Sequence, residues 1–141
     1  MQCKMMTFDT EEELRRERKA VELFVKLFEG SFKKLDPQDV DYKIFDKDEN
    51  LIAYAEIKGR IRTMHDAYPL PIAARKLVKL IDKRVAPVLI WACEDGIIYG
   101  KANKLEGVIK WGGFPPQDEL IDNELMVYYD KQKELKYVRF V

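Results

Sequence analysis

Residues 87–93 constrain the fold of this chain more than any other stretch, because every one of them is apolar. A short strand that is apolar on both faces is typical of the buried centre of a sheet, which needs other elements packed on each side. An acidic turn then leads into residues 97–100, which are expected to form the next strand. The run therefore predicts an α/β protein with a buried central strand.

Upstream of this run, two strands of about residues 41–45 and 51–58 are joined by a polar turn and form a hairpin. Side chains alternate along a strand, so Glu56 and Lys58 project from the same face of the second strand. The hairpin folds Asp41 back until it is level with Glu56. Two carboxylates on one face suit an oxygen-ligated Mg²⁺, and an adjacent lysine suits work on a water molecule or a developing charge.

An aspartate at a strand start, a hairpin, and a Glu-x-Lys tripeptide ending the next strand resemble the PD-(D/E)XK nuclease superfamily. That superfamily includes restriction-endonuclease-like and Holliday-junction-resolvase-like proteins. The resemblance implies that Asp41 and Glu56 are catalytic carboxylates that hold Mg²⁺ or Mn²⁺. It also implies that the Ile57 carbonyl assists them and that Lys58 is the catalytic lysine. Val40 stands where the family motif has proline, and the carboxylate with the chemical task is retained.

Other parts of the sequence compete with this assignment. Glu-x-Lys also occurs at residues 17–19 and 134–136, but only residues 56–58 have an acidic strand start before them and an amphipathic helix after them. Asp39 shares the parity of Asp41 and is a second ligand candidate, with a solvated turn residue as the alternative interpretation. Context, rather than the tripeptide, therefore selects the site.

The first helix is expected over residues 11–29, ended by Gly30, with an apolar stripe along one side. The stripe consists of Leu14, Val21, Phe24, Val25 and Phe28. Glu17 lies within it, and a carboxylate that faces a core needs a partner or must border a polar site. The resemblance implies that Glu17 lies beside the metal. The alternative is a partly exposed glutamate paired with a lysine or arginine.

A basic patch follows the motif, because residues 58–84 contain eight Lys or Arg against two Asp. A second helix is expected over residues 72–85, with an apolar face and a lysine stripe opposite it. The apolar face consists of Leu77, Val78, Leu80, Ile81 and Val85, and the stripe of Lys76, Lys79 and Lys83. The residues expected to bind nucleic acid are Arg60, Arg62, Arg75, Lys76 and Lys79. The alternative is a solvated charged face.

Two further side chains invite a functional interpretation. His65 lies in the loop of residues 59–68 without an expected partner, so it is interpreted as a solvated histidine. Trp111 stands beside glycines and could stack on a base, but we expect it to seal an edge of the core.

The overall charge of the chain excludes a general attraction to nucleic acid, because 25 Lys and Arg balance 25 Asp and Glu over 141 residues. Any basic surface is therefore local. Two cysteines far apart in sequence suggest neither a disulfide framework nor a zinc site, and no apolar run approaches transmembrane length. These features predict a cytoplasmic protein with no membrane association.

Taken together, the patterns predict a single α/β domain over residues 1–141, with a central mixed β-sheet flanked by helices. The resemblance implies the αβββαβ core of the superfamily over about residues 11–101. Residues 102–141 are expected to be an extension that ends in a β-hairpin of residues 125–129 and 135–141.

The function that follows is a Mg²⁺- or Mn²⁺-dependent nuclease acting on DNA phosphodiesters, and the resemblance suggests a phage, mobile-element or repair context. One alternative is a non-catalytic nucleic-acid-binding protein that keeps the fold. Another is a structural or interaction protein in which Asp41, Glu56 and Lys58 form a buried ion-pair network. The sequence leaves the form of the nucleic acid and the oligomeric state open, a homodimer included.

Overall fold

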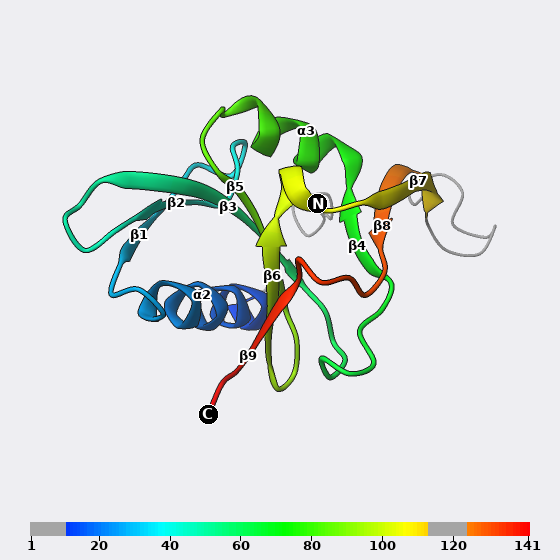
Figure 1. Cartoon of the computed structure of the whole chain (residues 1–141), viewed down its shortest axis with the longest axis horizontal. Coiled ribbons are helices and arrows are strands. Elements are labelled where there is room, and N and C mark those ends of the chain that lie inside the picture. The colour runs from blue at the N-terminus through cyan, green and yellow to red at the C-terminus, as the bar shows by residue number, and fades with distance from the viewer. Residues whose placement is uncertain (1–10, 113–123) are drawn as a thin grey trace, which may run out of the picture.

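The computed structural model of the chain describes residues 11–112 and 124–141 (Figure 1). Its helices are α2 (Glu11–Lys26), α3 (Ala74–Asp82) and the short 3-10 helix η1 (Ala102–Lys104). Its strands are β1 (Ser31–Lys34), β2 (Tyr42–Phe45), β3 (Leu51–Gly59), β4 (Leu70–Ala73), β5 (Pro87–Ala92), β6 (Gly96–Lys101), β7 (Gly107–Gly112), β8 (Glu124–Tyr129) and β9 (Lys136–Arg139). Among these residues, none of the helices has the length and apolar character needed to cross a membrane.

The main sheet has six strands in the order β1-β2-β3-β5-β6-β9. Neighbouring strands are antiparallel except β3 and β5, which are parallel, so the sheet is mixed as predicted. A parallel pair needs a crossover connection, and residues 60–86 provide it with β4 and α3. Every residue of β5 is buried, which confirms the predicted central strand.

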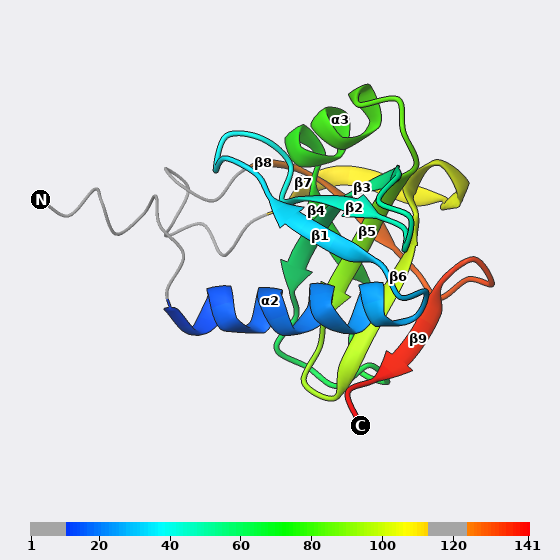
Figure 2. The same cartoon turned by 90° about the vertical axis from the view of Figure 1, so that its left-hand side faces the viewer.

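The helices α2 and α3 lie on opposite sides of the main sheet (Figures 1 and 2). α2 covers the face that carries Ala55, Ile57 and Ile90. The other face carries Leu89 and Trp91, and it is covered by α3 together with a second sheet. The alternation of side chains along β3 and β5 therefore supplies two apolar clusters, one on each side of the sheet.

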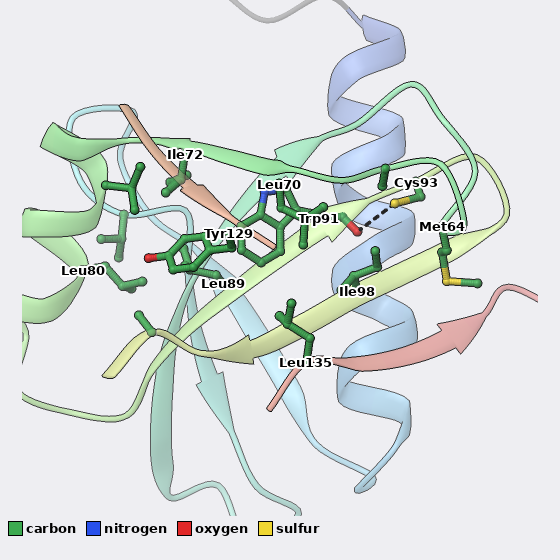
Figure 3. Close-up of a cluster of buried hydrophobic side chains, with 14 residues drawn as sticks. Met64, Leu70, Ile72, Leu80, Leu89, Trp91, Cys93, Ile98, Tyr129 and Leu135 are labelled. Atoms are coloured by element: carbon green, nitrogen blue, oxygen red, sulfur yellow. Dashed lines mark hydrogen bonds between the residues drawn. The ribbon is translucent and has the colours of Figure 1, made fainter. Parts of the chain in front are cut away.

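The second sheet has three antiparallel strands in the order β4-β8-β7. It packs over Trp91, which is fully buried at the centre of the cluster in Figure 3. The indole N–H donates a 2.8 Å hydrogen bond to the carbonyl oxygen of Pro71, and the ring meets Tyr129 edge to face with centroids 5.7 Å apart. A buried indole needs such an acceptor, so Trp91 fixes the second sheet against the first.

The C-terminal β-hairpin predicted for residues 125–129 and 135–141 is wrong. β8 pairs with β4 and β7, whereas β9 pairs with β6 at the edge of the main sheet. The two strands pack into different clusters, because Val127 contributes to the one around Trp91 and Val138 packs against the one under α2. The strand pattern is local, and it does not specify which distant strand becomes the partner.

Both helices are shorter than predicted. α2 ends at Lys26 and is followed by a turn, and α3 begins at Ala74 because residues 70–73 form β4 against β8. Of the predicted apolar face of α3, Leu80 is fully buried, whereas Val78 and Ile81 are exposed. The contact of α3 with the core is therefore narrower than the sequence pattern indicates.

Leu80 anchors α3 to the core, and its removal tests the arrangement of the layers. Leu80→Ala should lower the free energy of unfolding by about 2–5 kcal/mol, because it leaves a cavity in a fully buried cluster. Val78→Ala on the same helix, where the side chain is 66% exposed, should change it by less than about 0.5 kcal/mol. Denaturant unfolding of both variants measures the difference, and equal losses would contradict this placement of α3.

Candidate functional site

The hairpin of β2 and β3 places Asp41 beside Glu56. In its register Tyr42 pairs with Ala55. Asp41, which precedes Tyr42, therefore stands level with Glu56, which follows Ala55. The Oδ2 atom of Asp41 accepts a 2.8 Å hydrogen bond from the backbone N–H of Ile57. The predicted juxtaposition of the two carboxylates is confirmed, whereas their chemical roles remain predictions.

Glu56 is the more buried of these carboxylates, with 3% of its surface exposed. Lys76 of α3 reaches it, and 3.4 Å separate the lysine Nζ from Oε2 of Glu56. Burial, followed by the nearby charge of Asp41, raises the pKa of Glu56 to about 8, although Lys76 opposes the shift. The carboxylate therefore takes up a proton near neutral pH unless further positive charge comes close.

Glu17 projects from α2 toward the same region and is 9% exposed, in agreement with the predicted helix phase. Lys34 of β1 donates hydrogen bonds to both carboxylate oxygens of Glu17, at 3.1 and 3.3 Å. The Nζ of Lys34 also lies 3.9 Å from Oδ1 of Asp41. One ammonium group thus joins Glu17 to Asp41.

Lys58 lies two residues after Glu56 on β3, where strand alternation puts both on one face. The residue is exposed overall, yet its surroundings still lower the pKa of its amine. Partial burial is the largest cause, followed by the positive charges of Lys76 and Arg60. The shift brings Nζ closer to the neutral state in which it can accept a proton.

One pocket of about 210 Å³ brings together five of the ten predicted site residues. The predicted residues that line it are Glu17, Asp41, Ile57, Lys58 and Lys76. Glu56 is not among the lining residues of the described chain; it is buried and paired with Lys76, which does line the pocket. The first helix, the hairpin and the second helix therefore converge on one place, although they are far apart in the sequence.

Two of the predicted nucleic-acid contacts lie in the loop after β3. Arg60 braces that loop, because its Nε and Nη2 atoms donate hydrogen bonds to the carbonyls of Ala67 and Pro69, at 2.8 and 3.3 Å. Arg62 is exposed, and its carbonyl oxygen accepts a 2.9 Å hydrogen bond from the N–H of Glu94. Neither arginine is among the residues that line the pocket in the described part of the chain.

The other three predicted contacts lie on α3, and two of them, Arg75 and Lys79, have partners outside the pocket. Arg75 pairs with Glu124 of β8, with 2.8 Å between Nε and Oε1. Lys79 donates a 2.5 Å hydrogen bond from Nζ to the carbonyl of Gln38. Of the predicted lysine stripe, only Lys76 turns into the pocket, as far as the described residues show.

Asp39, the competing ligand candidate, does not reach the pocket. Its carboxylate pairs with Lys83 at 2.7 Å and accepts a hydrogen bond from the N–H of Val40. The hydrogen bond from Lys83 is the largest of the causes that lower the pKa of Asp39. Asp41 is therefore the aspartate that the fold directs to Glu56.

Three charged residues at the site are not among those that the sequence predicts: Glu13, Arg16 and Lys34. Glu13 precedes Glu17 by one helical turn, so the spacing alone places it on the same face. Lys34 pairs with Tyr42 across β1 and β2, which brings it next to Asp41. The place of Lys34 beside Asp41 can be predicted only if β1 is known to pair with β2, and the local sequence does not show that pairing.

Two side chains that the sequence singles out, Trp111 and His65, are not among the residues that line the pocket. Trp111 on β7 is 69% exposed, so the prediction that it seals the core is wrong, while stacking on a base remains a prediction. His65 is exposed, as predicted, and lines a different cavity with Tyr68 and Tyr137.

The oxygen donors at the site fit a hard divalent cation. Three carboxylates and the carbonyl of Ile57 are the ligand types that Mg²⁺ and Mn²⁺ prefer. As the side chains stand in residues 11–112 and 124–141, no group of three or more His, Cys, Asp or Glu is gathered tightly enough to hold a metal ion. Lys34 and Lys76 instead lie against the carboxylates. Burial and the charge of Asp41 outweigh the effect of Lys76 on Glu56, so the pKa of Glu56 stays raised.

Comparison with known proteins adds no relative: no protein-family model matches the chain, and no curated protein or solved structure matches it. The case for function therefore depends on the geometry of the site.

The raised pKa of Glu56 makes the stability of the metal-free protein depend on pH. The pKa is 4.5 for an ordinary glutamate and about 8 in the folded protein. Between these values the folded state binds more protons than the unfolded state, so Glu56 lowers the free energy of unfolding progressively as pH rises. Thermal melts in a chelating buffer should show the advantage of Glu56→Gln over wild type growing from pH 4.5 to pH 8.

The matched control is Glu134→Gln, which alters an exposed glutamate of another Glu-x-Lys tripeptide. Its melting temperature should follow that of wild type throughout. A constant difference between wild type and Glu56→Gln across this window would show that Glu56 keeps an ordinary pKa.

Proposed function

We propose that this protein is a divalent-metal-dependent nuclease that hydrolyses DNA phosphodiesters and has the restriction-endonuclease-like core of the PD-(D/E)XK superfamily. The observation that carries the proposal is the convergence of Glu17, Asp41 and Lys58 on one pocket, beside the buried Glu56. The element order supports it, since α2, β1, β2, β3, α3 and β5 follow the αβββαβ order with β4 inserted.

Asp41, Glu56 and the Ile57 carbonyl would hold Mg²⁺ or Mn²⁺, with Glu17 beside the ion. When bound, the ion would supply Lewis-acid stabilisation of the negative charge that develops on the phosphoryl group. Asp41 is prepared for this role, because the N–H of Ile57 fixes its Oδ2 and leaves Oδ1 turned toward Lys34.

The lysines of the pocket would act on the substrate. Lys58, whose pKa is lowered, can accept a proton from the attacking water at Nζ, or donate a hydrogen bond to the phosphoryl group when protonated. Lys76 lines the same pocket from α3 and would hold a phosphate oxygen. Arg75 and Lys79 share that helix, so DNA that reaches Lys76 would pass beside them.

A structural role for the same residues is the second candidate, because specific ion pairs favour it. Lys76 pairs with Glu56 at 3.4 Å, and Lys34 pairs with Glu17 at 3.1 Å. Such a network would neutralise the carboxylates without a metal. Metal binding separates the two candidates, because a network that is complete in itself offers no place for a further cation.

The first test therefore measures Mn²⁺ binding. Asp41→Asn keeps an oxygen acceptor for the N–H of Ile57 but removes one negative charge from the site. Wild type should bind Mn²⁺ and Asp41→Asn should lose detectable binding in calorimetry, with little change in melting temperature without metal. The matched control is Asp39→Asn, which alters a carboxylate paired with Lys83 and should bind Mn²⁺ as wild type does. Equal binding by Asp41→Asn and wild type would exclude this site.

The second test concerns catalysis. Lys58→Ala should reduce Mg²⁺-dependent cleavage of labelled DNA at least about a hundredfold, the usual effect of removing a group that assists proton transfer. Its Mn²⁺ affinity should stay close to that of wild type, because lysine is not a metal ligand here.

The controls for that test are Lys19→Ala and Lys136→Ala, which alter the other two Glu-x-Lys tripeptides. Both should cleave DNA at nearly the wild-type rate. A loss at Lys136→Ala as large as the loss at Lys58→Ala would mean that residues 56–58 are not the catalytic motif.

A further inference from the structure

Lys34 is in an unusual position for a lysine on an edge strand. Its Nζ lies 3.1 and 3.3 Å from the two oxygens of Glu17 and 3.9 Å from Oδ1 of Asp41. The ammonium group also lies 4.9 Å from the ring centroid of Tyr42. The register of β1 and β2, in which Lys34 pairs with Tyr42, holds the base of the side chain in place. The strand pairing thus delivers one positive charge to two carboxylates.

Asp41 faces positive charge on one side and a second carboxylate on the other. Its Oδ1 is turned toward Lys34, and the register of β2 and β3 sets it level with Glu56. The three carboxylates therefore create two adjacent places where a cation is favourable, one between Asp41 and Glu56 and one between Asp41 and Glu17. Sites that hold two divalent ions keep them about 3.5–4 Å apart.

We propose that Lys34 takes the place of a second metal ion, so that each chain binds one divalent cation, between Asp41 and Glu56, and not two. The inference rests on the proposed metal site and defines its composition. The ammonium group of Lys34 supplies the positive charge that Glu17 and Asp41 need on their shared side. A second divalent ion there would have to displace Lys34 against charge repulsion over a few ångströms.

The position of Lys34 lets its ammonium group replace a metal ion at a small cost in free energy. The side chain is 43% exposed, so the ammonium keeps part of its hydration while it contacts Glu17. A lysine fixed to β1 is present at all times, whereas a second ion must be recruited from solution. Glu17 then acts by positioning Lys34 against Asp41, and it does not itself need to ligate the bound ion.

The experiment counts bound Mn²⁺ ions per chain by calorimetry and by electron paramagnetic resonance of the free ion. Wild type should bind one ion, and Glu56→Gln should bind none. Lys34→Met keeps an unbranched stem over Tyr42 but removes the charge, so it should bind two ions. Adding Glu17→Gln to Lys34→Met should return the number to one. Lys33→Met, on the same strand with its side chain on the opposite face, should keep the wild-type number.

The outcomes separate the role of Lys34 from the metal site itself. Two ions in wild type, or one ion in a Lys34→Met variant that melts like wild type, overturn the role of Lys34 and leave the nuclease proposal standing. No Mn²⁺ bound to wild type overturns both. The wild-type count requires no substitution, so it decides the main point even if Lys34→Met does not fold.

Discussion

The parallel pairing of β3 with β5 is the constraint on which the rest of the molecule depends. Because β5 is buried on both faces, the end of β3 lies beside an apolar strand, with Glu56 opposite Leu89 and Lys58 opposite Trp91. A parallel pair also requires a crossover, and that crossover contains α3. The same connection that makes the sheet possible therefore brings Lys76 to Glu56.

Burial of Glu56 then sets the electrostatics of the site. A carboxylate with little exposure must bind a proton or gain positive charge nearby, since its desolvation is costly. Lys76 supplies one charge, but Asp41 at the same strand end adds a competing negative one, and the pKa still rises to about 8. Positive charge placed where the two carboxylates meet would lower the pKa of Glu56 again.

The parts of the site that sequence could predict are those that depend on local periodicity. Strand alternation and a short turn are sufficient to set Asp41 level with Glu56, and helix phase is sufficient to bury Glu17. The partner of a strand is not a local property. For that reason the sequence pattern pairs the C-terminal strands with each other and extends the second helix over residues 72–73 of β4. For the same reason Lys34 gives no signal until β1 is known to pair with β2. The basic residues of α3 share one helical stripe, yet their partners on β8 and in the loop before β2 decide which of them reaches the pocket.

A gain in folding stability does not by itself explain why charged side chains are gathered at this site. Desolvating two charges can cost as much as their attraction returns, and apolar side chains of similar volume often give equal or greater stability. Glu56 meets this description most closely, because it is nearly inaccessible and its partner Lys76 does not restore an ordinary pKa. Lys34 and Glu17 differ from it in degree, since the side chain of Glu17 is 11% exposed and that of Glu56 only 3%. The two pairs therefore have different physical characters within one pocket. Glu17 and Lys34 form a satisfied, partly solvated pair, whereas Asp41 and Glu56 form a carboxylate pair that is still short of positive charge, and a cation-dependent reaction would be centred on the second pair.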